Sequence, residues 1–152
     1  MVEVKLAEAL REFIRNAVKD FRLPVESGEY VFRAPTVING YLPPKRSGQD
    51  DDFPFVIVRV DGGDSEGEQT SVKVSIIIGC FAEEYDGHEY CLNVYSRIRN
   101  ALMSMKNGIL ANKYVLQQPI SWDIVPEQPY PQWQLDISTN WAFNAPQAEF
   151  DD

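Results

Sequence analysis

The sequence lacks long apolar runs, because no stretch approaches the ~20 consecutive apolar residues that a membrane-spanning helix requires. The first residues also mix charged with apolar side chains, so neither membrane insertion nor export is predicted. Cysteine is equally scarce, and the two thiols of Cys80 and Cys91 cannot build a disulfide framework. Both lie in apolar patterns, which is typical of small core side chains and indicates a reducing compartment.

Histidine is limited to His88, which lies on the first turn of a predicted helix without a serine or cysteine nucleophile motif beside it. We interpret it as a surface residue. Two thiols and one histidine match no zinc-ligand spacing, and no glycine motif that cradles phosphate is present. We therefore predict a protein that is not an enzyme and has no catalytic residues, metal ion or cofactor.

Basic side chains are few, since 14 Lys and Arg residues stand against 23 Asp and Glu residues, for a formal net charge of -9. Affinity for nucleic acid rests on the neutralisation of phosphates by Lys and Arg, so general DNA binding is not predicted. A protein surface along which DNA must slide functions better when it does not bind the DNA tightly. A location beside DNA is therefore compatible with this charge.

The chain does contain enough apolar residues for one folded domain. Hydrophobic residues make up 44% of its 152 positions, which suits a domain that buries a core without disulfides or metals. We expect a single α+β domain over residues 1–145 and a flexible acidic tail over residues 146–152. The predicted architecture is a mainly antiparallel sheet of about four to six strands with two helices packed on it.

Two helices are predicted from apolar residues at three- and four-residue spacing. The first runs from about Val2 to Phe21 and ends before Pro24, since proline disfavours helical backbone in the preceding residue. The second begins near Asp86, which can cap it, and Glu89 stands three residues later as in a capping box. The sequence Asn107-Gly108 is expected to end this helix.

Runs of β-branched residues predict the strands of the sheet. The strongest signals, Phe53–Val60 and Gln69–Phe81, are expected to pair as a hairpin. In the second run the apolar residues from Val72 to Cys80 alternate on one face, and Ile77 and Phe81 predict that the distal half is covered on both faces. Further extended segments are predicted at Tyr30–Ala34, Val37–Leu42, Val115–Val125 and Trp133–Phe143.

The segment between the two strongest strands is acidic and rich in glycine, so a long, flexible hairpin tip is predicted there. Like the polar loop 43–52, it is expected to gain order when neighbouring copies supply partners. The same acids are oxygen ligands of the kind that a metal ion binds, but they do not follow the spacing of a calcium loop. The candidate contact residues of this acidic segment are Asp61, Asp64, Glu66 and Glu68.

Tyr130 stands between two prolines in the predicted loop 126–131. A rigid loop that presents an aromatic side chain docks on a partner at low entropic cost, which makes Tyr130 a candidate contact residue. In the alternative arrangement its ring folds back over the sheet. The spacing of the neighbouring residues does not separate these two arrangements.

Several short sequence motifs follow one another along residues 1–145. After the opening amphipathic helix come Phe53-Pro-Phe-Val-Ile-Val, the acidic segment and Val72-Lys-Val-Ser-Ile-Ile-Ile-Gly. The turn Tyr85-Asp-Gly-His leads into Tyr90-Cys-Leu-Asn-Val-Tyr-Ser-Arg-Ile-Arg-Asn-Ala-Leu, and Pro129-Tyr-Pro-Gln-Trp opens the last strand. In this arrangement the chain resembles the tail-terminator (tail-completion) proteins of long-tailed bacteriophages and prophages.

The resemblance implies a small α+β subunit without enzymatic activity that forms a ring, often a hexamer, on the completed tail tube. The implied partners are further copies of the chain, the tail-tube protein and the head-tail connector protein, with DNA passing nearby without specific binding. The implied location is the virion tail, after assembly in the cytoplasm of the bacterial host. An acidic ring lumen that lets DNA slide through is a hypothesis that fits the net charge.

Three alternatives stay open. The first is another head-tail connector or a minor tail component, which shares the same acidic and non-enzymatic character. The second is a small metal-dependent enzyme that uses the acidic segment 61–68, and saturable heat on titration with divalent metals would favour it. The third is an intracellular adaptor without a role in the virion, which a persistent monomer would favour.

Overall fold

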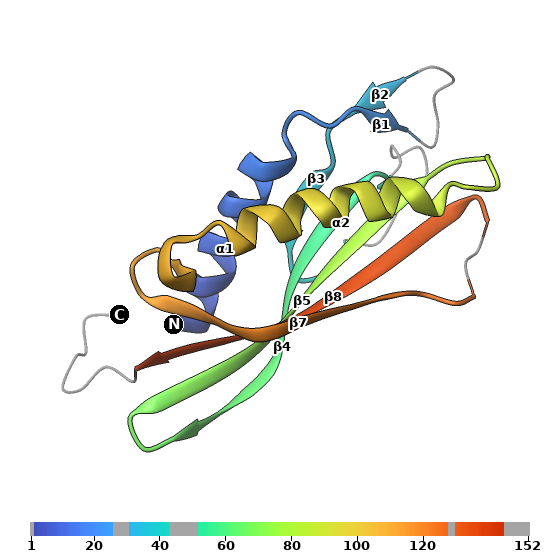
Figure 1. Ribbon diagram of the computed structural model, residues 1–152. Coiled ribbons are helices and arrows are strands. Elements are labelled where there is room, and N and C mark those ends of the chain that lie inside the picture. Colours follow the sequence, from blue (N-terminus) through green and yellow to red (C-terminus); the bar gives the residue numbers. More distant parts are fainter. Residues whose placement is uncertain (1, 26–30, 43–51, 128–129, 145–152) are drawn as a thin grey trace.

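The main sheet is curled and carries two helices, and a small second sheet lies beside it (Figure 1). The computed structural model describes residues 2–25, 31–42, 52–127 and 130–144. Within these ranges the main sheet has six strands in the order β3-β4-β5-β8-β7-β6, and the second sheet pairs β1 with β2. All neighbours in the main sheet are antiparallel except β3 and β4, so the predicted α+β fold class is confirmed.

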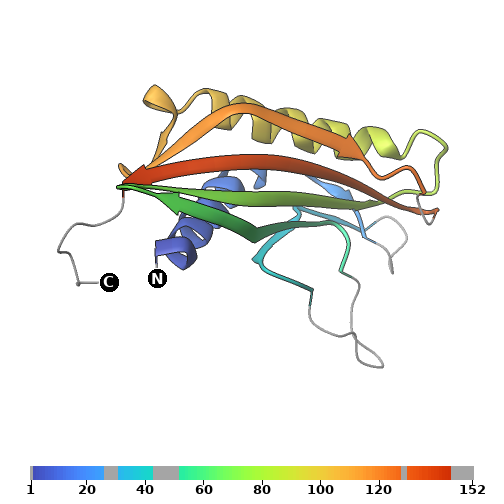
Figure 2. The same ribbon diagram turned by 90° about the horizontal axis from the view of Figure 1, so that it is seen from below.

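In sequence order, short strands precede a pair of long strands on each side of the second helix. The helices are α1 (Val2–Val18) and α2 (His88–Met103), and the short 3-10 turn η1 (Lys106–Gly108) follows α2. Figure 2 shows that the long strands β4, β5, β8 and β7 lie side by side. The strands are β1 (Leu23–Pro24), β2 (Phe32–Arg33), β3 (Thr36–Asn39), β4 (Phe55–Glu66), β5 (Gln69–Phe81), β6 (Ile109–Leu110), β7 (Tyr114–Ile124) and β8 (Gln132–Asn144).

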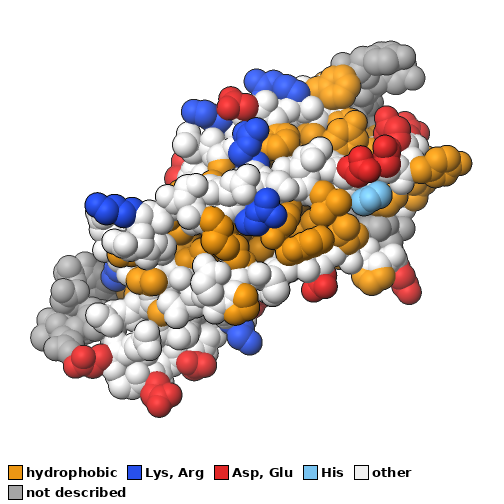
Figure 3. All heavy atoms as spheres, viewed as in Figure 1, with side chains coloured by type: hydrophobic (Ala, Val, Ile, Leu, Met, Phe, Trp, Pro, Cys, Tyr) orange, Lys and Arg blue, Asp and Glu red, His pale blue; other side chains and the backbone are white. Residues whose placement is uncertain are grey.

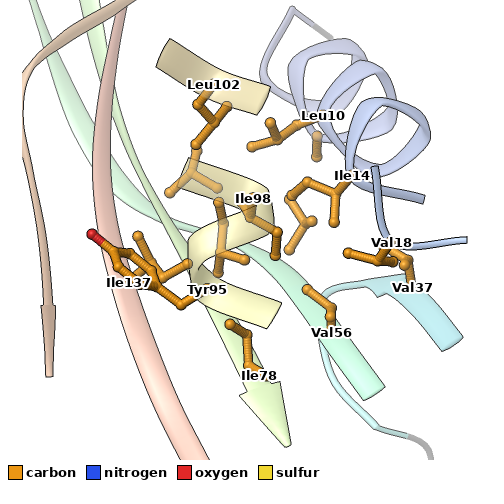
Figure 4. Packing of buried hydrophobic residues seen from close by; sticks show 14 of the residues in the cluster. Leu10, Ile14, Val18, Val37, Val56, Ile78, Tyr95, Ile98, Leu102 and Ile137 are labelled. Carbon is orange, nitrogen blue, oxygen red and sulfur yellow. The ribbon is translucent and has the colours of Figure 1, made fainter. Parts of the chain in front are cut away.

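The main core lies between the two helices and one face of the sheet. The alternating apolar residues of β5 from Val72 to Cys80 are buried on this face, as the period of two predicts. Leu10 and Ile14 of α1 meet Ile98 of α2 in the same core (Figure 4). Burying one apolar side chain of this size stabilises the fold by about 1.5–3 kcal/mol relative to leaving it in water.

The opposite face of the sheet carries a smaller apolar cluster of Phe55, Ile57 and Ile77. Ile77 is 8% exposed, which confirms that this part of β5 is covered on both faces. The ring of Phe55 lies directly over Gly79 of the paired strand. A Cβ atom at position 79 would collide with the carbons of this ring. The glycine therefore makes room for the aromatic ring.

The acidic segment is not the flexible hairpin tip that the sequence predicts. β4 continues through it, and the pairing with β5 reaches Glu66 opposite Gln69. Only Gly67 and Glu68 are left to form the turn, and Gly67 adopts a positive φ of 62°. The long partner strand β5 thus overrides the low strand propensity of Asp and Gly.

Glycine and hydroxyl side chains help to hold the two strands of this ribbon together. A Cβ atom at Gly63 would collide with the backbone of Ser71, so the glycine permits a close approach of the two strands. The side-chain oxygens of Ser65 and Thr70, which face each other across the ribbon, are hydrogen-bonded at 3.0 Å. The glycines that suggested a loop therefore serve strand pairing.

The start of α2 differs from the predicted capping box. The helix begins at His88 with Gly87 as its N-cap, and no side chain caps it. The Asp86 carbonyl oxygen accepts a hydrogen bond of 2.9 Å from the backbone N–H of Glu89 instead. A side chain larger than hydrogen is excluded at Gly87, because its Cβ atom would meet the indole ring of Trp133.

Both helices end earlier than predicted. α1 ends at Val18 and α2 at Met103. The backbone of Asn107 and Gly108 has positive φ angles of 58° and 69°, so these residues turn the chain from η1 into β6 and do not end α2 directly. The predicted loop 43–52 lies outside the described residues except for Asp52, and the tail 146–152 lies wholly outside them.

A buried hydrogen-bonded network joins β5 and β8 within the main core. Thr139 is 1% exposed, and its hydroxyl donates a 2.7 Å hydrogen bond to the Val74 carbonyl oxygen. The same hydroxyl oxygen accepts a 2.8 Å hydrogen bond from the indole N–H of Trp141, which is fully buried. The network satisfies polar groups that would otherwise be costly to bury. Neither described helix is long and apolar enough to cross a membrane.

Candidate functional site

The four acidic candidates lie on the ribbon formed by β4, β5 and the turn between them. Asp61, Asp64 and Glu66 belong to β4, Glu68 lies in the turn, and all four are exposed. The carboxylate of Asp61 accepts a hydrogen bond from the hydroxyl of Ser75 on β5. The acids are therefore arranged along an ordered ribbon and not on a mobile tip.

The outer edge of β4 is open along this ribbon. β3 pairs only with Phe55–Val58, and no described strand lies beside the later residues of β4 on that side. The last backbone contact is a 2.8 Å hydrogen bond from the Gly40 N–H to the Val58 carbonyl oxygen. Such an edge presents backbone groups that pair readily with another strand.

A shallow groove of about 340 Å³ lies beside the open edge of β4, between the start of α1, the end of β3 and the middle of β4. Three apolar side chains in it contact water: Val4 is 50% exposed, Tyr41 70% and Val60 37%. The Arg59 guanidinium lies 3.9 Å from the Tyr41 ring centroid. Exposed apolar side chains gathered in one groove are typical of a contact surface.

The opposite edge of the sheet, formed by β7 and β6, is open as well. β6 pairs only with Tyr114 and Val115, so no described strand lies outside β7 from Gln117 to Ile124. Near this edge Trp122 is 42% exposed, and its ring centroid lies 5.1 Å from that of Tyr95 on α2. Figure 3 shows hydrophobic side chains in the seam between α2 and β7. Both edges of the sheet therefore adjoin exposed apolar groups.

Tyr130 lies at the far end of the sheet and combines both predicted arrangements. Its hydroxyl donates a hydrogen bond to the carbonyl oxygen of Glu83, and its ring meets that of Trp133 edge-on with centroids 6.2 Å apart. The side chain nevertheless stays 55% exposed, and Tyr85 in the turn before α2 is 98% exposed. His88 lies partly buried beside Trp133, with ring centroids 6.0 Å apart, rather than on the open surface.

An acidic hollow of about 330 Å³ adjoins the start of α2. Glu84, Asp86 and Glu89 line it together with Tyr90. Partial burial, and then the charges of Glu84 and Asp86, raise the pKa of the Tyr90 hydroxyl. The negative field that opposes ionisation of this tyrosine also favours a basic group of a partner.

The structure does not bring the acidic ribbon and Tyr130 together. Tyr130 lies just before the start of β8, whose first residue pairs with Phe81, whereas the ribbon adjoins its last residue, Asn144. The 13 residues of β8, at about 3.3 Å each, separate the two ends by roughly 40 Å. The candidate contact residues therefore belong to two separate surfaces.

Among the described residues, no three His, Cys, Asp or Glu side chains lie close enough to hold a metal ion. Cys80 and Cys91 are free thiols buried where α2 packs on β5, which confirms their assignment to the core. The thiol of Cys91 donates a long 3.9 Å hydrogen bond to the Ile78 carbonyl oxygen. The pKa of the Cys80 thiol is raised well above its usual range, first by a hydrogen bond with Cys91 and then by burial.

Sequence reasoning missed the groove, and it could not say which strands form the open edges. Val4 lies off the apolar stripe that α1 buries, and this position is the signal that marks it as a contact residue. Tyr41 and Val60 read as ordinary residues near strand ends. Open edges depend on the spatial order of the strands, which no local sequence pattern reports.

The chain matches no known family model and no curated protein. The likeness to tail terminators therefore rests on the residues of the chain itself.

Proposed function

We propose that this protein is a structural tail terminator of a long-tailed bacteriophage or prophage. In this role copies of the chain form a ring that caps the tail tube and provides the surface to which the head joins. The observation that carries the proposal is the main sheet, which is open at both edges of its described part and has exposed apolar side chains beside each edge. A subunit of this kind is completed by neighbours, since unprotected edges are a liability in a lasting monomer.

Two different edges on one subunit favour a head-to-tail arrangement. When one edge of a copy meets the other edge of the next, the contact repeats around an axis and closes into a ring if the rotation fits. The end of the sheet away from the acidic ribbon, where Tyr85 and Tyr130 are exposed, is then free for a different protein. We assign this end to the tail-tube protein or the head-tail connector.

The proposed subunit has no enzymatic role. The formal net charge of -9 is compatible with DNA that passes the ring without being held. The alternative of a metal-dependent enzyme at residues 61–68 receives no support, because in the described chain these acids form an open row along a ribbon. The virion tail, after assembly in the bacterial cytoplasm, is the location that fits this role.

Binding to preformed tail tubes tests the proposal. The purified protein is mixed with tubes of the tail-tube protein encoded in the same genome, and the tubes are imaged by negative-stain electron microscopy. We expect ring-shaped density at one end of each tube and no further tube growth after capping. Protein that decorates the tube sides, or binds only a head-tail connector, would assign the chain to another neck or tail component.

A further inference from the structure

The two open edges of the sheet have complementary steps. On one edge β3 covers Phe55–Val58, and the later part of β4 is set back by one strand. On the other edge β6 covers Tyr114 and Val115, and β7 is set back from Gln117 onward. Each edge therefore has one projecting short strand and one recess.

The strand register places each projection at the level of the recess on the opposite edge. Ile109 of β6 pairs with Val115, and the row continues through Ala142 and Ser71 to Asp64 in the recess of β4. A second row runs from Ile38 of β3 through Ile57, Ile77 and Asp136 to Asp123 in the recess of β7. Two copies placed side by side at the same level thus bring each projection into a recess.

We propose that a second copy of this chain occupies the open edge of β4, and that the sheets of adjacent copies continue into one another head to tail. In this contact β6 of one copy lies along the recess of β4 in the next, while β3 of the next copy fills the recess of β7. The proposal rests on the proposed function, because it specifies the contact that joins neighbours in the ring. Because β6 of one copy and β3 of the next share one strand position, each copy adds five strands at every level, or about 24 Å of sheet at about 4.8 Å per strand.

The chemistry of the two edges supports a copy of the chain as the occupant. Lys106 and Lys113 lie on either side of β6, and Glu3, Asp64 and Glu66 lie around the recess of β4. Opposite charges therefore meet when β6 enters this recess, which directs the partner and fixes its register.

Disulfide trapping between two variants tests the contact, each with one added surface cysteine besides the buried Cys80 and Cys91. Asp64→Cys and Ile109→Cys both replace exposed side chains, and their rows place them on the same face of the sheet. Neighbouring strands about 4.8 Å apart suit the Cα separation of a disulfide. On mild oxidation over a concentration series, we expect an equimolar mixture to give a covalent dimer and either variant alone to give none.

A matched control uses Ser138→Cys, which is exposed in the middle of β8, one strand in from the open part of β7 and in a different row from Ile109 and Asp64. Mixed with Asp64→Cys, it is expected to give less than about a tenth of the dimer. Dimers from either edge variant alone would show two-fold pairing and would overturn the head-to-tail contact. Absence of the mixed dimer at every concentration would overturn it as well.

The outcomes separate this contact from the proposed function. Mixed dimers without rings on tail tubes would leave the edge contact in place and reject the terminator role. Rings on tubes without mixed dimers would leave the role in place and reject the edge contact. In addition, Lys106→Glu with Lys113→Glu is expected to weaken association about tenfold at low salt, and Asp64→Lys with Glu66→Lys in the same chain to restore it.

Discussion

Replacing Thr139 by valine removes a hydroxyl that makes two hydrogen bonds in the core. Valine has nearly the same shape, so the change leaves little cavity and isolates the polar contribution. The Trp141 N–H, fully buried, loses its acceptor, which costs about 1–3 kcal/mol, and the lost bond to the Val74 carbonyl adds about 1 kcal/mol. We expect a free energy of unfolding lower by about 2–4 kcal/mol.

Urea unfolding followed by tryptophan fluorescence measures this loss. Thr139→Ser keeps the hydroxyl and removes only a methyl group, so it is expected to cost about 1 kcal/mol. Ser138→Val, one residue away on the exposed side, is expected to change stability by less than about 0.5 kcal/mol. In a Trp141→Phe background, where the indole donor is absent, the valine substitution must cost less. An equal cost in both backgrounds would refute the role of the network.

Two further predictions concern the buried thiol and a packed glycine. Because the raised pKa of Cys80 keeps the thiol protonated in the folded state, the contribution of Cys80 to the free energy of unfolding should be constant below about pH 8.5 and fall as the pH rises above it. Alkaline urea titrations should show a shallower initial fall for Cys80→Ala, and equal slopes would contradict the assignment. Gly79→Ala should lower the free energy of unfolding by about 1–3 kcal/mol, because its methyl group displaces the Phe55 ring; this cost should shrink in a Phe55→Ala background.

Regular periodicity explains the elements that could be predicted from the sequence. The alternation in β5 and β8 and the stripes of α1 and α2 each reflect one buried face, and burial is what the hydrophobic pattern records. The pairing of β4 with β5 followed from their adjacency in the chain. The parallel pairing of β3 with β4 joins segments separated by residues 40–54, so no hairpin signal marks it.

The acidic segment shows why local composition misled. Asp and Gly favour turns, yet the ribbon is held by β5, which is itself paired with β8 over its whole length. Strand formation there depends on tertiary partners, and these outweigh propensities that span only about 1 kcal/mol. The capping residue of α2 was missed for a similar reason, since the ring of Trp133 admits only glycine at position 87.

The prediction for Tyr130 could not be decided from the sequence because both arrangements hold at once. Its hydroxyl binds Glu83 while about half of the side chain faces water. The groove was missed because its three apolar residues come from α1, from β4 and from the segment just after β3, which meet only in the folded chain. Local pattern therefore predicts elements and faces, whereas surfaces formed between elements require the fold.

Electron microscopy of particles from a phage genome in which this gene is removed tests the central claim most directly. We expect tails of uncontrolled length that are not attached to heads, and restoration of normal tails when the gene is supplied in trans. Normal tail length and attached heads in the absence of the protein would contradict the account.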